Sequence, residues 1–111
     1  MSYNFTNNKA IGIDQDYLDV TSSRFAGSTY TNTTGRTITL SVWVVNTGSS
    51  GGSGLNVLID GEIKASQIVS QTVGAGNMAP GIVIPIPSTS EYVVTTSNSN
   101  IVKWFELQGD N

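Results

Sequence analysis

Alternation of aliphatic and other residues within one stretch is the feature that most restricts how this chain can fold. In residues 37–46, TITLSVWVVN, the side chains of Ile38, Leu40, Val42 and Val44 occupy every second position. Because successive side chains of a β-strand point to opposite faces, all four fall on one face of an extended strand. The stretch therefore predicts a strand with one core-facing side.

Two turn signals predict how neighbouring strands pair. Asp60-Gly61 is a pair typical of two-residue type I′ turns, so the stretches on either side of it are expected to form a β-hairpin. The loop at residues 32–36, NTTGR, contains a glycine that tolerates a positive φ. It predicts a second hairpin, which joins a strand at 24–31 to the alternating strand.

The last two apolar stretches are also expected to be strands. Residues 81–87, GIVIPIP, carry prolines on one face, and since proline donates no backbone hydrogen bond, this strand is expected at a sheet edge or a subunit contact. In residues 101–107 simple alternation places Ile101 on the side opposite Trp104 and Glu106.

These patterns together predict an all-β fold. A short strand is expected within residues 11–20, with Ile11 and Ile13, and further along Tyr17, Leu18 and Val20, turned inward. The aspartates between them leave a helix open as the alternative. Short strands, frequent turn residues and no clear helix favour an antiparallel β-sandwich, with one small domain per chain at residues 11–111. Residues 1–10 are polar and aperiodic, and we interpret them as a linker or the truncated end of a longer chain.

Composition excludes several classes of function. The chain has no cysteine and no histidine, which removes disulfides, the usual zinc sites and thiol or histidine catalysis. Only five basic residues are present, they are scattered, and the net charge is -3, so nucleic acid is disfavoured as a partner. We find neither a membrane-spanning run nor a signal-peptide pattern, and expect a chain made soluble in a cytoplasm.

The acidic residues lack the patterns of a metal site or a glycosidase. Asp14, Asp16 and Asp19 are spaced as in a calcium loop, but the glycine at the sixth position and the final glutamate are missing. Asp60 and Glu62 form a pair of carboxyl groups, yet the hairpin turn already accounts for Asp60. We therefore predict no metal, no cofactor and no catalytic residue.

A series of short motifs runs through residues 11–42. In order, the motifs are Gly12 with Gln15, Asp19-Val20-Thr21, Ser23-Arg24 and the run from Gly27 to Gly35. This series resembles the start of the C-terminal tip (receptor-binding) domain of tailed-bacteriophage and prophage tail-fibre proteins. The C-terminal residues Trp104, Glu106 and Leu107 also resemble the end of this domain. Residues 47–100 resemble it only in their general arrangement of strands and loops. Thr37 departs from the pattern, because related sequences often have proline there.

The resemblance implies a function as well as a fold. Domains of this family form homotrimers at the fibre tip of the virion and bind a bacterial surface receptor, often a polysaccharide. The resemblance therefore implies binding of a surface glycan without catalysis or membrane insertion, by a protein made in the host cytoplasm. One alternative is a structural module that trimerises or caps the fibre, with recognition elsewhere. Another is a glycan-degrading enzyme, which the placement of the acids disfavours.

Three residues are candidates for receptor contact. Asn77 and Met78 lie in a glycine-rich loop at 72–80 and offer a hydrogen-bonding amide and an adaptable apolar tip. A second loop, at 47–54, offers little besides serine hydroxyls, and either loop can equally be a simple connection. Trp104 offers a ring for stacking on a sugar, unless it is buried in the core.

Two further residues are candidates for a contact between chains. Trp43 and Val45 lie on the face of the alternating strand opposite its aliphatic row, which makes the second half of that strand apolar on both sides. Either the domain covers both faces itself or Trp43 and Val45 meet another chain of a trimer.

Overall fold

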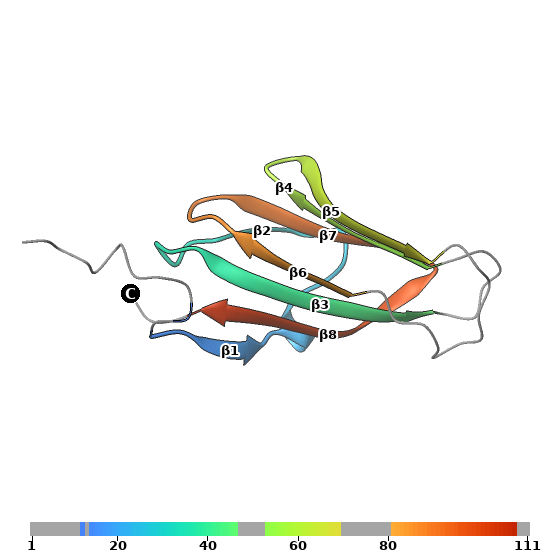
Figure 1. The fold of residues 1–111 in the computed structure, drawn as a ribbon, viewed down its shortest axis with the longest axis horizontal. Coiled ribbons are helices and arrows are strands. Elements are labelled where there is room, and N and C mark those ends of the chain that lie inside the picture. Colours follow the sequence, from blue (N-terminus) through green and yellow to red (C-terminus); the bar gives the residue numbers. More distant parts are fainter. Residues whose placement is uncertain (1–11, 13, 47–52, 70–80, 109–111) are drawn as a thin grey trace, which may run out of the picture.

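The computed structural model describes residue 12 and residues 14–46, 53–69 and 81–108. Antiparallel strands within these ranges form two four-stranded sheets, ordered β1-β8-β3-β6 and β2-β7-β4-β5, which pack face to face (Figure 1). The predicted antiparallel β-sandwich is confirmed. The elements are β1 (Asp16–Asp19), the 3-10 turn η1 (Thr21–Ser23), β2 (Thr29–Thr31), β3 (Ile38–Asn46), β4 (Ser53–Ile59), β5 (Glu62–Val69), β6 (Gly81–Ile86), β7 (Glu91–Ser97) and β8 (Ser99–Gln108).

The core lies between the two sheets and includes the predicted aliphatic row of β3. Leu40 and Val44 are fully buried, and they share the core with residues of the facing sheet such as Leu55, Val57 and Val94. Strand β3 is central in its sheet, because β8 pairs with it on one side and β6 on the other. The prediction of a core-facing side for residues 37–46 is therefore confirmed, and β3 anchors its sheet.

The hairpin at Asp60-Gly61 is confirmed. Strands β4 and β5 pair directly across it, with Ile59 opposite Glu62. Both turn residues have positive φ, 51° at Asp60 and 86° at Gly61, as a type I′ turn requires. The Asp60 carboxylate also accepts hydrogen bonds from Ser90 Oγ and the Glu91 N–H, both at 3.0 Å, which tie the turn to the start of β7.

The edge position predicted for residues 81–87 is also confirmed. Strand β6 pairs only with β3 in the described part of the sheet. Pro85 lies opposite Thr39 and is exposed, and Val83 beside it is 69% exposed. An edge position suits proline because no further strand needs its missing N–H.

The second predicted hairpin is wrong. Strand β2 pairs with β7 in the facing sheet rather than with β3, so residues 32–37 carry the chain from one sheet to the other. The buried Asn32 side chain directs this crossing: its Nδ2 donates to the carbonyl oxygens of Arg36, Ile86 and Pro87 at 2.7, 3.0 and 3.1 Å. Amide hydrogen bonds of this kind satisfy backbone groups that a sheet ladder would otherwise satisfy.

The predicted strands at 11–20 and 24–31 are much shorter in the structure. Strand β1 spans only four residues at the sheet edge, and Tyr17 and Leu18 are 61% and 47% exposed rather than turned inward. Tyr17 lies in register with Leu107 and Thr39, on the face that points away from the core. Gly27, with φ 84°, belongs to a turn that precedes β2, so only residues 29–31 of the predicted strand at 24–31 are extended and paired.

A β-bulge in β8 changes the face to which its first residues point. Trp43 pairs with Lys103 but Val44 pairs with Ile101, which leaves Val102 as the extra residue. Because of the bulge, Ile101 and Trp104 both face the core, although simple alternation places them on opposite faces. The prediction for Ile101 is therefore wrong, while Trp104 and Glu106 do share a face.

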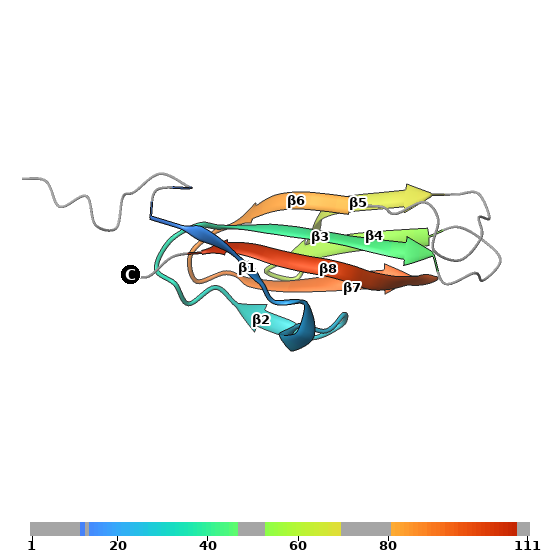
Figure 2. The same ribbon diagram turned by 90° about the horizontal axis from the view of Figure 1, so that it is seen from below.

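One side of the sandwich is closed by the crossing segment, residues 20–28, which includes η1. It leaves β1 at the edge of one sheet and reaches β2 at the edge of the other (Figure 2). Within the described ranges no helix is long and apolar enough to cross a membrane. The predicted linker at 1–10 and most of both glycine-rich loops lie outside the described residues, although Ser53 and Gly54 belong to β4 and are buried.

Candidate functional site

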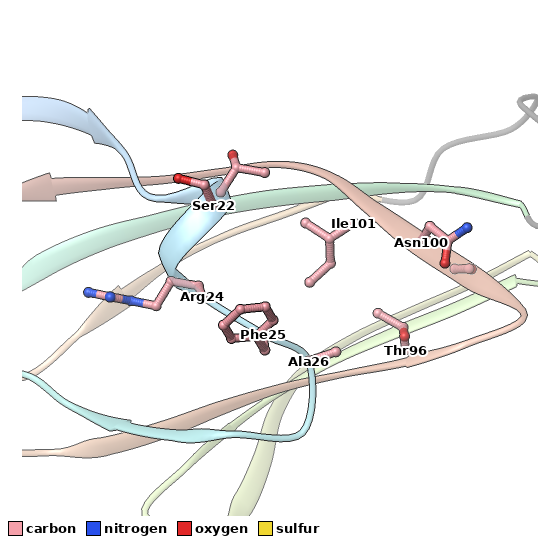
Figure 3. A pocket seen from close by; sticks show the side chains of 9 residues that line it. Ser22, Arg24, Phe25, Ala26, Thr96, Asn100 and Ile101 are labelled. Carbon is pink, nitrogen blue, oxygen red and sulfur yellow. The ribbon is translucent and has the colours of Figure 1, made fainter.

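A groove of about 340 Å³ lies between the crossing segment and the point where the chain passes from β7 to β8 (Figure 3). Its volume is at the lower end of the ~300–1,000 Å³ typical of small-molecule sites. Hydroxyls, an amide, an aromatic ring and aliphatic groups line it together. The lining residues are Thr21, Ser22, Arg24, Phe25, Ala26, Thr96, Ser99, Asn100 and Ile101.

Phe25 is the aromatic residue of the groove, and its ring is exposed. Its side chain is 64% exposed, although the chain on both sides of it is held in place. Figure 3 shows the ring between Arg24 on one side and Thr96 and Asn100 on the other. A large exposed apolar side chain that borders a groove is a common feature of binding sites.

Backbone hydrogen bonds tie the crossing segment to both sheets. At its start, Val20 N–H donates to the Trp104 carbonyl of β8 at 2.9 Å, and Trp104 N–H donates to Thr21 Oγ1 at the same distance. At its end, Gly27 N–H donates to the Val94 carbonyl of β7 at 2.8 Å. Phe25 therefore stands on a short segment that is fixed at both ends.

The Glu106 cluster holds the middle of the crossing segment. The Glu106 side chain is fully buried, and its carboxylate accepts hydrogen bonds from Arg24 Nε and Nη2, Tyr92 OH, Trp104 Nε1 and Gln108 Nε2 at 2.7–3.2 Å. Five donors saturate the acceptor sites of a carboxylate, so its burial leaves no oxygen unsatisfied. The cluster anchors Arg24, the residue next to Phe25, in the core.

Tyr30 adds a second anchor beside the same residues. Its hydroxyl accepts a hydrogen bond from Phe25 N–H at 2.8 Å, and the Arg24 guanidinium lies 4.7 Å from the centre of its ring. The ring also packs edge-on against Trp104, with 5.9 Å between centroids. Both the Arg24 side chain and the Phe25 backbone are thus attached to Tyr30, a half-buried residue that packs against the core.

Burial and charge pairing shift the pKa values of the cluster. Burial raises the pKa of the Tyr92 hydroxyl, and the neighbouring Glu106 carboxylate raises it further. For Arg24, burial lowers the pKa, but hydrogen bonding and attraction to Glu106 outweigh burial and raise it overall. At neutral pH, Tyr92 therefore stays a hydrogen-bond donor and Arg24 stays a cation.

Asp19 caps the start of the crossing segment on its outer side. Its Oδ1 accepts hydrogen bonds from Thr21 Oγ1 at 2.6 Å and Thr21 N–H at 3.0 Å, and its Oδ2 lies 3.2 Å from Lys103 Nζ. The Thr21 hydrogen bonds, and then Lys103, lower the pKa of Asp19 from 3.8 to about 2. Within the described residues no group of three potential ligands is placed to hold a metal, and Asp14, Asp16 and Asp19 form no such cluster.

The candidate ligand contact at Trp104 is wrong, because the side chain takes the alternative role left open for it, burial in the core. The ring is fully buried, its indole N–H donates to Glu106 at 3.0 Å, and the Tyr30 ring packs against it in a T-shaped pair. A ring without exposed surface has no face to offer a ligand. Trp104 instead stabilises the crossing segment from within the core. Its indole N–H donates to Glu106, and its backbone N–H donates to Thr21 Oγ1.

Trp43 and Val45 lie on the outer face of the β1-β8-β3-β6 sheet, as predicted from their alternation with the core row. Both are half-buried, and the Trp43 ring packs against Phe105 with 5.7 Å between centroids. Nearby, Tyr17, Ser41 and Phe105 line a shallow apolar hollow of about 290 Å³. The outer face is therefore covered only in part by its own side chains.

Two of the candidate receptor residues, Asn77 and Met78, lie outside the described residues. Sequence reasoning had also missed the residues that line the groove, Phe25 above all, because it assigned Phe25 to a strand. The available signal was the absence of alternation around it: in RFAGS a single large ring stands among small and charged residues. A lone aromatic in a stretch without periodicity is poorly explained as core.

Comparison with known proteins gives only distant likenesses. Neither a protein-family model nor a curated protein matches the sequence. A family 35 carbohydrate binding module from Clostridium thermocellum aligns at 15% identity with a TM-score of 0.42, over 84% of this chain and 68% of its own. Dimeric latent PorU from Porphyromonas gingivalis aligns at 13% identity, also with a TM-score of 0.42, over 90% of this chain and 10% of its own. Likenesses this weak say nothing about a site or a ligand.

Proposed function

We propose that this protein binds a glycan, without catalysis, in the groove between the crossing segment and the β7–β8 connection. The observation that carries the proposal is the exposed Phe25 ring on a segment fixed to both sheets, beside hydroxyl and amide side chains. Preorganised sites lose less conformational entropy when a ligand binds, so a fixed exposed ring is well suited to recognition.

The groove offers the two kinds of contact that a sugar ring makes. A sugar presents apolar C–H faces, which pack on the π-face of an aromatic ring such as Phe25. It also presents hydroxyls that both donate and accept hydrogen bonds. Ser22, Thr96 and Asn100 carry groups with both abilities, and among the described residues none of these three side chains is engaged in another hydrogen bond.

The biological setting we propose rests on the resemblance of residues 11–42 to phage tail-fibre tips. In that setting the ligand is a polysaccharide of the bacterial surface, and the protein is a homotrimer at the end of a fibre on the virion. Repetition of the groove in three copies raises avidity for a repeating polymer without any new contact. Weak binding by one groove is therefore compatible with firm attachment.

A structural role is the second candidate, and the outer face of the β1-β8-β3-β6 sheet favours it. Tyr17 and Val83 are 61% and 69% exposed there, next to Trp43 and Phe105. An apolar face of this kind suits contact with other copies of the chain. The protein then trimerises or caps the fibre, and the receptor is recognised by another part of it.

A glycan array separates the two candidates. The intact protein, fluorescently labelled, is applied as wild type, as Phe25→Ala and as Ile68→Ala. Ile68 is a matched control, because it is exposed to a similar degree, 70%, but lies on β5, at the sheet edge opposite β2, and does not line the groove. We expect Phe25→Ala to reduce binding about fivefold or more, since loss of a ring contact worth ~1 kcal/mol lowers affinity by about that factor.

The outcome for each candidate is distinct. Glycan binding by wild type and Ile68→Ala, with loss in Phe25→Ala, supports the groove. Equal binding by all three proteins places recognition elsewhere on the chain. If no glycan binds the wild type while the protein is trimeric, the structural role is the better account.

A further inference from the structure

The charges around the groove point to the class of glycan that it accepts. Arg24 is the one ionisable residue among the described residues that line the groove. Its Nε and Nη2 are both hydrogen-bonded to Glu106, at 3.2 and 3.1 Å, and the Glu106 side chain is fully buried. Glu106 balances the charge of this guanidinium, so a ligand carboxylate gains less from Arg24 than from an unpaired cation.

The direction of the guanidinium strengthens this conclusion. Figure 3 shows the Arg24 side chain extending away from Phe25, Thr96 and Asn100, so that its aliphatic part borders the groove while its charge lies outside. Stacking over the Tyr30 ring at 4.7 Å holds it in that orientation. The aliphatic part of Arg24 thus borders the groove, while Glu106 balances the charge of its guanidinium.

The two charged residues beside Thr21, a lining residue of the groove, are also paired. Asp19 and Lys103 lie at the outer end of the crossing segment, 3.2 Å apart, and the Asp19 carboxylate is further engaged by Thr21. What the groove itself offers is a phenyl ring and groups that both donate and accept, at Ser22, Thr96 and Asn100. Sugar hydroxyls match such groups, whereas a carboxylate only accepts and gains most from free cations.

We propose that the groove selects uncharged sugar residues and discriminates against uronic and other acidic sugars. This inference rests on the proposed function and names the ligand class of the same site. Because the paired charges leave no cation for the ligand, binding depends little on ionic strength. Surface polysaccharides rich in neutral hexoses are then receptors, and acidic capsules are not.

Matched pairs of methyl glycosides test the inference on the wild-type protein. Each pair, from glucose, galactose or mannose, consists of the glycoside and its uronide, which differ only in oxidation at C6. Affinities are measured by two-dimensional NMR titration. We expect the neutral member of any pair that binds to be favoured by at least about threefold, and to lose less than about twofold in affinity when salt rises from about 50 to about 500 mM.

A charge variant supplies a positive control. Ser22→Lys places an unpaired ammonium beside the groove, on an exposed position of η1, and Ser22→Gln is the uncharged control. Relative to Ser22→Gln, we expect Ser22→Lys to gain about threefold in uronide affinity, and to lose that gain at high salt. Such a gain demonstrates that the wild-type groove lacks a cation of its own.

The results that overturn the inference differ from those that overturn the proposed function. If a uronide binds wild type as tightly as its neutral partner, or more tightly, the groove still binds sugars but the neutral class is wrong. The same conclusion follows if Ser22→Lys brings no gain over Ser22→Gln. If none of the six glycosides binds wild type, the proposed function fails, and the inference fails with it.

Discussion

At the scale of single residues, the structure is dominated by one buried carboxylate. Glu106 gathers donors from Arg24, Tyr92, Trp104 and Gln108, which come from three different parts of the chain. The cost of burying this charge is offset only while all partners are present. Glu106 therefore both stabilises the core and fixes the segment on which Phe25 is displayed.

Removal of this carboxylate should be among the most damaging single substitutions in the chain. Glu106→Ala leaves the half-buried Arg24 cation, the Tyr92 hydroxyl and the Trp104 N–H without their acceptor. We expect the free energy of unfolding to fall by ~3–5 kcal/mol, measured by urea denaturation. Substitution of the exposed Glu91 by alanine is the control and should change it by less than ~0.5 kcal/mol. A loss below ~1 kcal/mol for Glu106→Ala contradicts the role given to the cluster.

Asp19 predicts a specific pH dependence. Its folded pKa of about 2 lies below the ordinary value of 3.8, so its contribution to stability is present above pH 3.8 and is lost as the pH falls through about 2. Asp19→Asn should therefore lower the melting temperature at pH 7, and the difference from wild type should shrink below pH 3.8 and vanish as the pH falls below about 2. A difference that is constant from pH 7 to pH 2 argues against this assignment.

At the scale of elements, some features of the sequence predicted the fold and others concealed it. The alternation in residues 37–46, the Asp60-Gly61 turn and the proline of β6 each depend on local geometry, and each is confirmed. The bulge at Val102 and the crossing at Asn32 depend instead on partners far away in the chain. Neither a single extra residue in a strand nor an asparagine in a turn changes the hydrophobic periodicity of a sequence. The bulge and the crossing therefore could not be predicted from periodicity.

The candidate site was hidden for the same reason. Phe25 is exposed because its segment is anchored by contacts with residues such as Glu106, 82 positions from Arg24. The sequence alone places Glu106 on one face of an alternating strand and gives it no partner. It also leaves open whether Trp104 is buried or stacks on a sugar. Long-range pairing decided which of these aromatics is buried and which faces solvent.

The β4–β5 hairpin yields a prediction that depends on backbone conformation alone. Gly61 has φ 86°, and a Cβ added there meets no atom within 4 Å. Gly61→Ala should therefore lower the free energy of unfolding by ~1–2 kcal/mol through left-handed strain, without steric clash. Thermal denaturation measures the loss, with alanine substitution of the exposed Glu62 as control. An unchanged stability means that the turn is not type I′ in solution.

At the scale of the whole molecule, the two sheets present different surfaces to their surroundings. The β1-β8-β3-β6 sheet exposes apolar groups on its outer face, whereas the groove lies on the side closed by the crossing segment. Contact between copies through the outer face therefore leaves the groove accessible. Assembly and recognition are in this account carried by different parts of one sandwich.

Trp43 tests the proposed assembly. We expect the wild type to have three times the mass of one chain in static light scattering at micromolar concentration. Trp43→Ala should shift the mass towards one chain, because the substitution removes an aromatic ring from the apolar outer face. In the wild type this ring packs on Phe105. Circular dichroism checks that the sandwich persists. A monomeric wild type, or a Trp43→Ala protein that remains trimeric, rules out this contact.

The most direct test of the central claim is to map where a glycan touches the protein. The wild type, labelled with ¹⁵N, is titrated with the glycan that gives the strongest array signal, and amide shifts are followed residue by residue. The account predicts that the largest changes fall at residues 21–26 and 96–101, around the groove. Changes confined to the outer face near Tyr17 and Phe105, or to residues outside both regions, would contradict it.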